Sequence, residues 1–206
     1  MRKLVVGTFV SLDGVMQGPG GPDEDRSDGF DQGGWNATLW DDAMGEIMAE
    51  QASRSEALLL GRKTYEIFAA HWPRMPEDDP MAAKLNSMPK YVASTTLDTA
   101  EWQNSTLLKR SVPDEVAKLK SQDGGEIHVI GSGNLIQTLL KHDLVDEFVL
   151  WVWPVLLGEG KRLFADGTIP KALKLIDTKV SSTGVAIQTY QTAGTPEYGS
   201  FALEDQ

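Results

Sequence analysis

Residues 126–140, EIHVIGSGNLIQTLL, form the stretch of this sequence best suited to bind a phosphate. A short apolar run ends at Gly131-Ser132-Gly133, and apolar residues at helical spacing follow, which predicts a strand, a glycine-rich turn and a helix. Glycines let the backbone approach a ligand closely, and the free N–H groups and positive dipole of a helix start favour an anion. Because many α/β proteins turn a corner in the same way, the stretch alone leaves both interpretations open.

A second junction of this kind follows the predicted buried strand 56–60. Gly61 is followed by Arg62, Lys63 and Thr64, which open a short predicted helix. Cations at a helix N-terminus oppose the dipole, so these two are poorly placed for stability alone. A bound anion would resolve that conflict, and the alternative is that both side chains extend into water.

A third polar segment, Ser94-Thr95-Thr96, follows the predicted strand 90–93. Its hydroxyls suit either phosphate and sugar oxygens or a plain turn. Ligands of open α/β sheets bind outside the carboxyl ends of the strands, so we expect the three segments to converge on one crevice. The G-x-G-x-x-G dinucleotide fingerprint is absent, because Ile136 stands where its third glycine would fall.

The acidic residues of the first 50 positions are weaker indications of a binding or catalytic site. Asp41 and Asp42 suit either a solvated helix face or a pocket. The pattern argues against an EF-hand loop starting at Asp23, because its positions 6 and 12 would be Asp28 and Gly34 instead of glycine and glutamate. With no cysteine and three scattered histidines, the sequence predicts no metal site.

The remaining pattern predicts an α/β fold with one long irregular loop between residues 12 and 36. We expect a helix over 38–53 capped by Thr38, and two antiparallel strands around Gly184. Further helices are expected near 80–87 and 113–120, and further strands at 2–11, 101–108 and 146–157. From Gly194 onward the sequence looks like a tail, so the predicted organisation is one domain, 1–193, and a tail, 194–206.

Composition argues against a nucleic-acid-binding protein and against a membrane protein. The 206 residues carry a net charge of −11, which argues against a nucleic-acid partner. The apolar runs are too short to span a bilayer, and the N-terminus shows no cleavage signal, so we expect a cytoplasmic protein without membrane contact.

The sequence resembles the dihydrofolate reductase-like superfamily in five segments that occur in the same order: KLVVGTFVSLDGVM, LLLGRKTYE, KYVAST, EIHVIGSGNLIQTLL and PVLLGEGKRLF. It is most similar to the C-terminal reductase domain of the bifunctional riboflavin-biosynthesis deaminase–reductase, over most of residues 2–191. The resemblance implies a three-layer fold with a mixed, mostly parallel sheet, flanking helices and an antiparallel C-terminal hairpin. The zinc ligands of the deaminase half are absent, which implies a stand-alone reductase.

The resemblance also implies NADPH as the cofactor. It assigns the following residues to cofactor binding: Gly61, Arg62, Lys63, Thr64, Ser94, Thr95, Gly131, Ser132, Gly133, Asn134 and Leu135. Dihydrofolate reductases commonly have a cation where Asn134 stands. A preference for NADPH over NADH therefore depends here more on Arg62 and Lys63.

The resemblance further implies hydride transfer to a C=N or C=O group of a small pyrimidine- or pterin-like substrate, as in 5-amino-6-(5-phosphoribosylamino)uracil reductase. Asp13 matches an S-x-D-G motif beside the substrate and is the first candidate for the polar catalytic group, ahead of Asp41 and Asp42. Either a carboxyl group or an ordered water would supply the proton. Residues 17–36 are expected to close over the substrate. The substrate side is expected to include Trp35, Gly158 and Gly160.

Three alternatives stay open: a nucleotide-binding subunit without turnover, a true dihydrofolate reductase, and a purely structural domain. Asp13 has its own alternative as a turn residue. The resemblance also favours a homodimer. The apolar run Phe148–Leu157 is interpreted either as a core strand or as a dimer contact.

Overall fold

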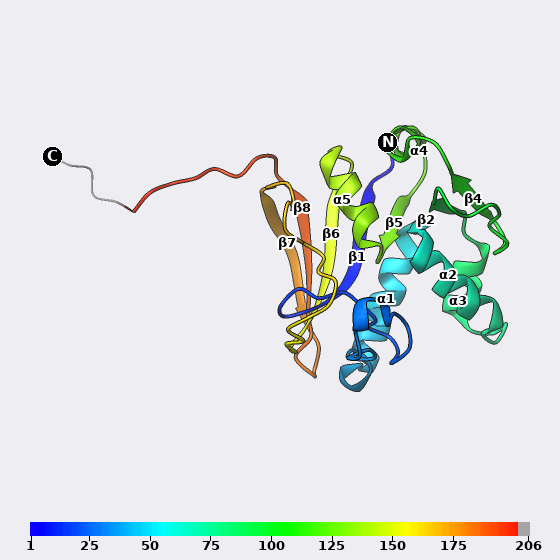
Figure 1. Ribbon diagram of the computed structural model, residues 1–206, viewed down its shortest axis with the longest axis horizontal. Helices are drawn as coiled ribbons and strands as arrows, with labels where there is room; N and C mark the ends of the chain where they lie inside the picture. The colour runs from blue at the N-terminus through cyan, green and yellow to red at the C-terminus, as the bar shows by residue number, and fades with distance from the viewer. Residues whose placement is uncertain (202–206) are drawn as a thin grey trace.

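An eight-stranded sheet runs through the computed structural model, which describes residues 1–201 (Figure 1). The end of the predicted tail, residues 202–206, lies outside the described residues. The strands lie in the order β4-β3-β2-β5-β1-β6-β8-β7. Their bounds are β1 Leu4–Ser11, β2 Ser55–Gly61, β3 Lys90–Ala93, β4 Ser105–Leu108, β5 Glu126–Ile130, β6 Glu147–Trp153, β7 Leu173–Val180 and β8 Ala186–Thr192.

The six strands from β4 to β6 in this order are parallel to their neighbours, and β8 and β7 form the antiparallel C-terminal hairpin. This arrangement confirms the predicted fold class. In a parallel sheet the carboxyl ends of the strands meet at one edge, so the polar segments that follow β1, β2, β3 and β5 lie along the same edge.

Helices cover both faces of the sheet and make it a three-layer structure (Figure 1). The helices are α1 Asp42–Arg54, α2 Arg62–His71, α3 Pro80–Ser87, α4 Val112–Ser121 and α5 Gly133–Lys141. The buried residues of α4 and α5 pack against one face of β1, β2 and β5. Met44 of α1, Tyr65 of α2 and Leu85 of α3 pack on the other face. Two faces of apolar cover explain why the parallel strands read as nearly continuous apolar runs.

The first helix begins later than the sequence predicts. Thr38 lies in a short 3-10 turn and caps no helix, because Asp41 is the N-cap of α1 and accepts a hydrogen bond from the N–H of Met44 at 2.9 Å. Trp40, which falls inside the predicted helix 38–53, instead precedes α1 and stacks on Trp151 at 6.0 Å between ring centroids. A carboxylate is a better cap than the chain offers upstream, and this sets the start of the helix.

Strand β6 lies between β1 and β8, and Phe148 and Trp151 are each 1% exposed. The part of the apolar run that lies in β6, residues 148–153, is therefore a core strand, which is one of the two interpretations that the sequence left open. The predicted strand 146–157 ends earlier, at Trp153, and Leu156 beyond it is 73% exposed. In the part of the chain that is described, no helix is long and apolar enough to cross a membrane.

Candidate functional site

The ends of β2 and β5 meet through one hydroxyl group. The N–H of Gly61 donates to Oγ of Ser132 at 2.8 Å, and that hydroxyl lies 2.9 Å from Oγ1 of Thr64. A Cβ atom on Gly61 would lie 3.1 Å from Oγ of Ser132, so the close approach favours glycine. Two of the three segments that the sequence predicted to converge are thus in direct contact.

The two helices that begin at this junction have no side-chain cap. Neither Gly61, the N-cap of α2, nor Ser132, the N-cap of α5, makes a capping side-chain bond, whereas Asp41 and Asp79 cap α1 and α3. The first N–H groups of a helix have no partner within it, and Ser132 uses its hydroxyl to join Gly61 and Thr64 instead. Both helix starts therefore leave N–H groups at this edge of the sheet for an anion.

The glycine turn has an unusual backbone. Gly131 and Ser132 both have left-handed conformations, with φ of 56° and 69°. Such a conformation costs a serine on the order of 1 kcal/mol or more, and backbone strain of this kind is common at binding sites. A Cβ on Gly133 would lie 3.3 Å from Sδ of Met16, so the loop after β1 lies against the turn. Asn134 is exposed, and Leu135 is buried in the core.

The two cations of α2 differ in their partners. Arg62 is half-exposed and lies 3.6 Å from Glu66 of its own helix. The ammonium of Lys63 donates to Oγ of Ser27 at 3.1 Å and lies 3.5 Å from Asp25. The alternative that both side chains simply extend into water does not hold for Lys63, which is joined to the long loop.

Ser94, at the end of β3, is buried and closes a turn. Its hydroxyl accepts the N–H groups of Thr96 at 3.2 Å and Leu97 at 3.0 Å, which is the plain-turn alternative of the sequence analysis. Thr95 is exposed. Since β3 is the neighbour of β2, this turn lies along the same edge of the sheet as Gly61.

Asp13 joins the loop after β1 to the segment after β6. Its carboxylate accepts hydrogen bonds from Oγ of Ser11 at 2.6 Å, from the N–H of Gly158 at 2.8 Å and from the N–H of Leu157 at 3.2 Å. Arg162 lies 3.4 Å away. The hydrogen bond from Ser11 and those from the backbone lower the pKa of Asp13 to about 2, so the group is ionised at neutral pH.

A second carboxylate, that of Asp25, lies in a cluster with Ser27 and two lysines. Lys161 lies 2.8 Å from Asp25, and both Lys161 and Lys63 hydrogen-bond to the hydroxyl of Ser27. Burial raises the pKa of Asp25, but the hydrogen bonds from Lys161 and Ser27 outweigh it and hold the pKa well below its usual value. The cluster connects three separate segments: the long loop, the start of α2 and the segment after β6.

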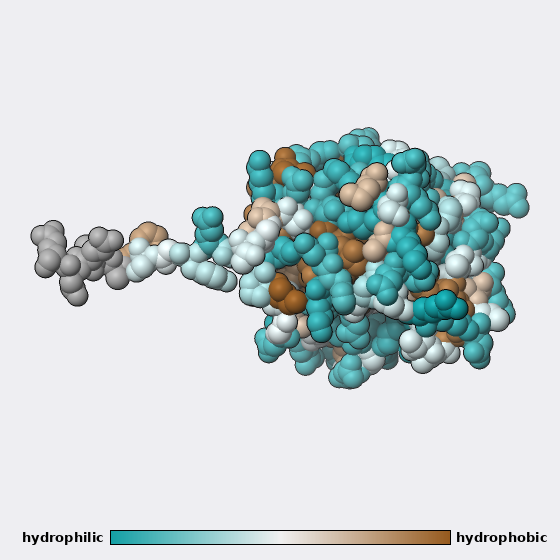
Figure 2. All heavy atoms as spheres, turned by 90° about the horizontal axis from the view of Figure 1, so that it is seen from above, coloured by the Kyte–Doolittle hydropathy of each residue, from teal (hydrophilic) through white to brown (hydrophobic). Residues whose placement is uncertain are grey.

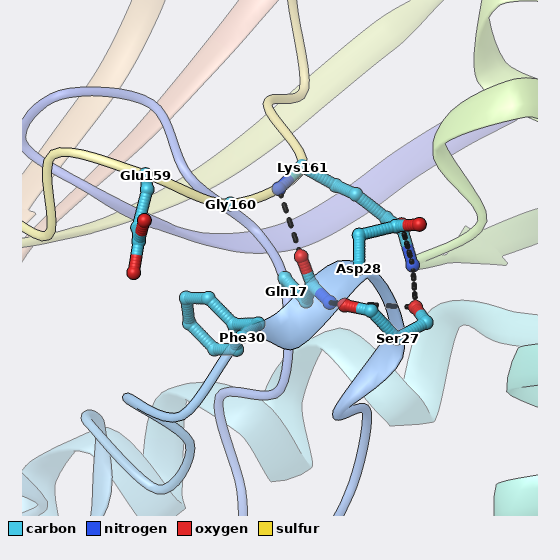
Figure 3. Close-up of a pocket in the computed structure, with 7 residues that line it drawn as sticks. All are labelled: Gln17, Ser27, Asp28, Phe30, Glu159, Gly160 and Lys161. Carbon is cyan, nitrogen blue, oxygen red and sulfur yellow. Dashed lines mark hydrogen bonds and ion pairs between the residues drawn. The ribbon is translucent and has the colours of Figure 1, made fainter.

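A pocket of about 260 Å³ lies beside this cluster (Figure 3). It is lined by Gln17, Ser27, Asp28, Phe30, Glu159, Gly160 and Lys161. Gln17 accepts the N–H of Lys161 at 3.0 Å and donates to the carbonyl of Ser27 at 3.0 Å. In Figure 3 these three residues lie together on one side, and the ring of Phe30 and Glu159 lie on the other. The pocket thus has one apolar wall and several polar groups.

Of the three substrate-side residues that the sequence predicted, only Gly160 lines this pocket. It has a φ of 113°, and a Cβ there would lie 2.7 Å from Val15 and 2.9 Å from Phe30. Gly158 is occupied with Asp13. Trp35 lies in the core with 9% exposure, where its indole N–H donates to the carbonyl of Gln17 at 2.8 Å. The apolar cluster beneath the loop, including Trp153, explains why this ring is buried rather than presented to a ligand.

The two carboxylates at the start of α1 lie apart from the pocket lining. Asp41 caps the helix with one oxygen, and the other accepts the N–H and hydroxyl of Ser182 at 2.9 and 2.7 Å, in the turn between β7 and β8. These hydrogen bonds, first that of the Ser182 hydroxyl, lower the pKa of Asp41. Asp42 is exposed on the first turn of the helix.

Sequence reasoning missed most of the pocket. Gln17, Ser27 and Phe30 belong to the loop without periodicity, and nothing in their order indicates that they meet. Lys161 had one available signal, since it directly follows Gly158-Glu159-Gly160, a turn already assigned to the substrate side.

Comparison with known proteins gives consistent matches over nearly the whole chain. The family model for the RibD C-terminal domain matches residues 2–189. The Bacillus subtilis protein YyaP is 31% identical over 94% of this chain and 96% of its own length. The crystal structure of a putative riboflavin biosynthesis protein from Shewanella is 25% identical, with a TM-score of 0.64 over 93% of this chain and 99% of the other.

A more distant match concerns the fold alone. Dihydrofolate reductase from Enterococcus faecalis, in complex with NADP(H), has a TM-score of 0.57 at 16% identity, over 92% of this chain and 96% of its own. The three-layer fold with its antiparallel hairpin is thus dihydrofolate reductase-like.

Proposed function

Since the chain belongs to the RibD C-terminal domain family, we propose that it is an NADPH-dependent reductase of a small heterocyclic substrate. Family membership and the dihydrofolate reductase-like fold support an oxidoreductase. The finer points, NADPH and a pyrimidine- or pterin-like acceptor with a C=N or C=O group, belong to the proposal. NADPH, when bound, supplies the hydride.

The observation that carries the proposal is the pair of uncapped helix starts joined by Ser132. The N–H groups of Gly133, Asn134 and Leu135 at the start of α5, and those at the start of α2, suit the pyrophosphate of a dinucleotide. Glycine at position 61 lets the two starts come this close. The donors present therefore fit the cofactor that the family resemblance implies.

Arg62 and Lys63 supply the positive charge that a phosphorylated cofactor needs. Arg62 is half-exposed beside Glu66 and is free to turn toward the adenosine phosphate. Lys63 is held by Ser27 and Asp25, so it must exchange these partners for a phosphate. Ser94 and Thr95 lie on the same edge, and we assign Thr95 the contact with the 2′-phosphate because the hydroxyl of Ser94 already closes a turn.

The 260 Å³ pocket is the proposed substrate site. Phe30 offers a flat apolar wall for a heterocycle, and Gln17, Asp28 and Glu159 offer polar groups for its edge. We propose that the loop 17–36 acts as a cover, anchored by Trp35 in the core and attached to α2 through Lys63.

Asp13 positions the pocket in this proposal and does not deliver the proton. A carboxyl group with a pKa near 2 is almost entirely ionised at neutral pH and is a poor general acid. Its hydrogen bonds to Gly158 and Leu157 fix the segment that carries Gly160 and Lys161. An ordered water is then the proposed proton donor.

One observation favours a second candidate, a subunit that binds NADPH without turnover. Asp13 is ionised and Asp41 is used as a helix cap, so neither of the leading carboxylates is suited to donate a proton. The two candidates differ only in turnover.

A titration with NADPH followed by a substrate panel tests both. We expect saturable NADPH binding, seen as a change in nicotinamide fluorescence, and thermal stabilisation that grows with NADPH concentration. Arg62→Ala should weaken binding, whereas Arg26→Ala, a change of an arginine paired with Asp23 on the loop surface, should not. Loss of nicotinamide absorbance with a pterin, pyrimidine or flavin precursor identifies the reductase. Binding without oxidation of NADPH by any acceptor supports the second candidate, and absence of NADPH binding rejects both.

A further inference from the structure

The lining of the 260 Å³ pocket carries two carboxylates and one ammonium group. The carboxylates belong to Asp28 and Glu159, and the ammonium group to Lys161. Asp28 lies beside Lys161 on one side of the pocket, and Glu159 lies on the other side with the ring of Phe30 (Figure 3). A ligand in the pocket therefore meets negative charge from two sides and an aromatic wall between polar groups.

The positive charge of Lys161 is already neutralised by other side chains. Its ammonium group lies 2.8 Å from Asp25, hydrogen-bonds to the hydroxyl of Ser27 and lies 3.7 Å from Asp28. A phosphate at this position would have to displace Asp25 from the ammonium group. The pocket thus contains a cation that is not available to an anionic ligand.

The uncharged polar side chains of the pocket also use their donors within the protein. The two hydrogens of the Gln17 amide go to the carbonyls of Asp25 at 3.2 Å and Ser27 at 3.0 Å, and the hydroxyl of Ser27 donates to the carboxylate of Asp25. Ionised Asp28 and Glu159 only accept hydrogen bonds. The side chains that line the pocket therefore suit a ligand that donates N–H groups.

Glu159 is exposed, but the backbone on both sides of it is held in place. The N–H of Gly158 donates to Asp13 at 2.8 Å. Gly160 lies so close to Phe30 that a Cβ atom there would be 2.9 Å from the ring. These contacts keep the carboxylate of Glu159 at the pocket.

The position of Asp28 is set by a bend in the loop. Asp28 has a left-handed backbone conformation with φ of 61°, and Gly29 follows with φ of 83°. Asparagine and aspartate adopt this conformation more readily than other residues with a side chain. Asp28→Asn is therefore a substitution that removes the charge and keeps the bend.

We propose that the substrate carries a positively charged amino or amidinium group and no phosphate, and that Asp28 and Glu159 bind this group. Phe30 packs on the ring of the substrate, and the two carboxylates accept its charged N–H groups. The face shown in Figure 2 is mostly hydrophilic, and the chain carries a net charge of −11, which attracts a cation and repels a phosphate. The inference rests on the proposed function, because it names the ligand of the same pocket.

Calorimetric titration of the full chain with three small aromatic compounds tests the charge of the ligand. Benzamidine is a cation, benzamide is its uncharged analogue, and phenyl phosphate is an anion. We expect benzamidine to bind about 10-fold more tightly than benzamide, and phenyl phosphate to bind more weakly than either. Absence of benzamidine binding, equal binding of benzamidine and benzamide, or preferred binding of phenyl phosphate overturns the inference.

A double variant assigns this preference to the pocket. Asp28→Asn combined with Glu159→Gln should weaken benzamidine binding about 10-fold and leave benzamide binding unchanged. The matched control combines Glu101→Gln with Asp123→Asn, which makes the same change in net charge at two exposed residues outside the pocket lining. It should bind both compounds as the wild type does. Equal effects of the two double variants would show that the preference arises elsewhere and overturn the inference.

Turnover of the substrate panel with NADPH separates this inference from the proposed function. An acceptor with a protonated amino group should have a higher kcat/KM than its uncharged analogue, and the pocket double variant should raise its KM. Reduction of phosphorylated acceptors in preference to their unphosphorylated analogues overturns the inference and leaves the proposed function standing. If NADPH does not bind, the proposed function fails, and the titrations without NADPH still decide the charge of the ligand.

Discussion

Asp13 illustrates how one carboxylate can be structural and still belong to the site. It accepts the hydroxyl of Ser11 and two backbone N–H groups from the segment after β6, and it lies in the turn that precedes Met16 and Gln17. All of these donors favour the ionised form. The position of Asp13 near the proposed substrate pocket would suit a proton donor, but its ionised state suits a residue that holds the segment after β6 in place.

The first prediction concerns the pH dependence of that contact. The folded-state pKa of Asp13 is about 2, below the ordinary value of 3.8, so its contribution to stability is present above about pH 4 and is lost as the pH falls toward 2. Asp13→Asn should be less stable than the wild type at pH 7, and the difference should shrink over that acid range. Urea unfolding at several pH values measures it. Asp31→Asn, at an exposed loop position, is the control, and a difference that does not change with pH contradicts the prediction.

Lys90 is a buried cation outside the site. It is fully buried, donates to the carbonyls of Asn86 at 3.0 Å and Met88 at 2.7 Å, and lies 4.3 Å from the ring centroid of Trp102. Burial lowers its pKa from 10.5 to about 8. The unfolded chain therefore retains this proton over a pH range in which the folded chain has released it.

The second prediction follows from the sign of that shift. The stability of the wild type relative to Lys90→Met should rise with pH between about 8 and 10.5, by an amount on the order of 3 kcal/mol. Below this range the cost of burying the charge is fully present, and above it the cost is absent. Urea unfolding of both proteins across the range measures the rise. Exposed Lys141→Met should show no such trend, and parallel curves for the wild type and Lys90→Met would falsify the assignment.

At the scale of elements, the site depends on two loops that hold each other. Residues 14–16 pair with residues 161–163, through the N–H of Met16 to Lys161 at 2.8 Å and the N–H of Leu163 to Gly14 at 3.0 Å. Phe30 and Val15 then pack on Gly160. The loop after β1 and the segment after β6 therefore form one unit at the carboxyl ends of two adjacent parallel strands.

The third prediction compares two glycines of that unit. Gly160→Ala should lower the free energy of unfolding by about 2–4 kcal/mol, because its Cβ would lie 2.7 Å from Val15 in a left-handed conformation. Gly158→Ala, where φ is also positive but no atom lies within 4 Å, should cost only about 1–2 kcal/mol. Urea unfolding of the two variants measures the costs, and equal costs would show that packing on Gly160 is unimportant.

At the scale of the whole molecule, the sequence predicted the strands and turns that depend on local residue pattern. Apolar runs before glycine or hydroxyl residues located β2, β3 and β5, and their parallel pairing brought Gly61 to Ser132 as expected. Asp25 and Gln17 were not predicted, because their partners are more than 130 residues away in the sequence, at Lys161. The start of α1 was misplaced because Thr38 and Asp41 are both acceptable caps, and only the structure shows that the carboxylate of Asp41 accepts the N–H of Met44.

The exposed face of β7 also required the structure. Its sequence, LKLIDTKV, predicts an ordinary half-buried strand of a hairpin. Only the strand order places it at the edge, and only the register aligns Leu175 with Phe148 through Tyr190.

The attachment of Lys63 to Ser27 and Asp25 has a kinetic consequence for the proposed reaction. One ammonium group cannot hold a cofactor phosphate and the loop carboxylate with full strength at the same time. By thermodynamic linkage, the contact between Lys63 and the loop lowers the affinity for the cofactor by the same free energy by which bound cofactor weakens that contact. NADPH and the substrate should therefore bind in order, with NADPH first. Its binding at Lys63 weakens the contact that holds the loop 17–36 over the substrate pocket, and the substrate must pass this loop to enter.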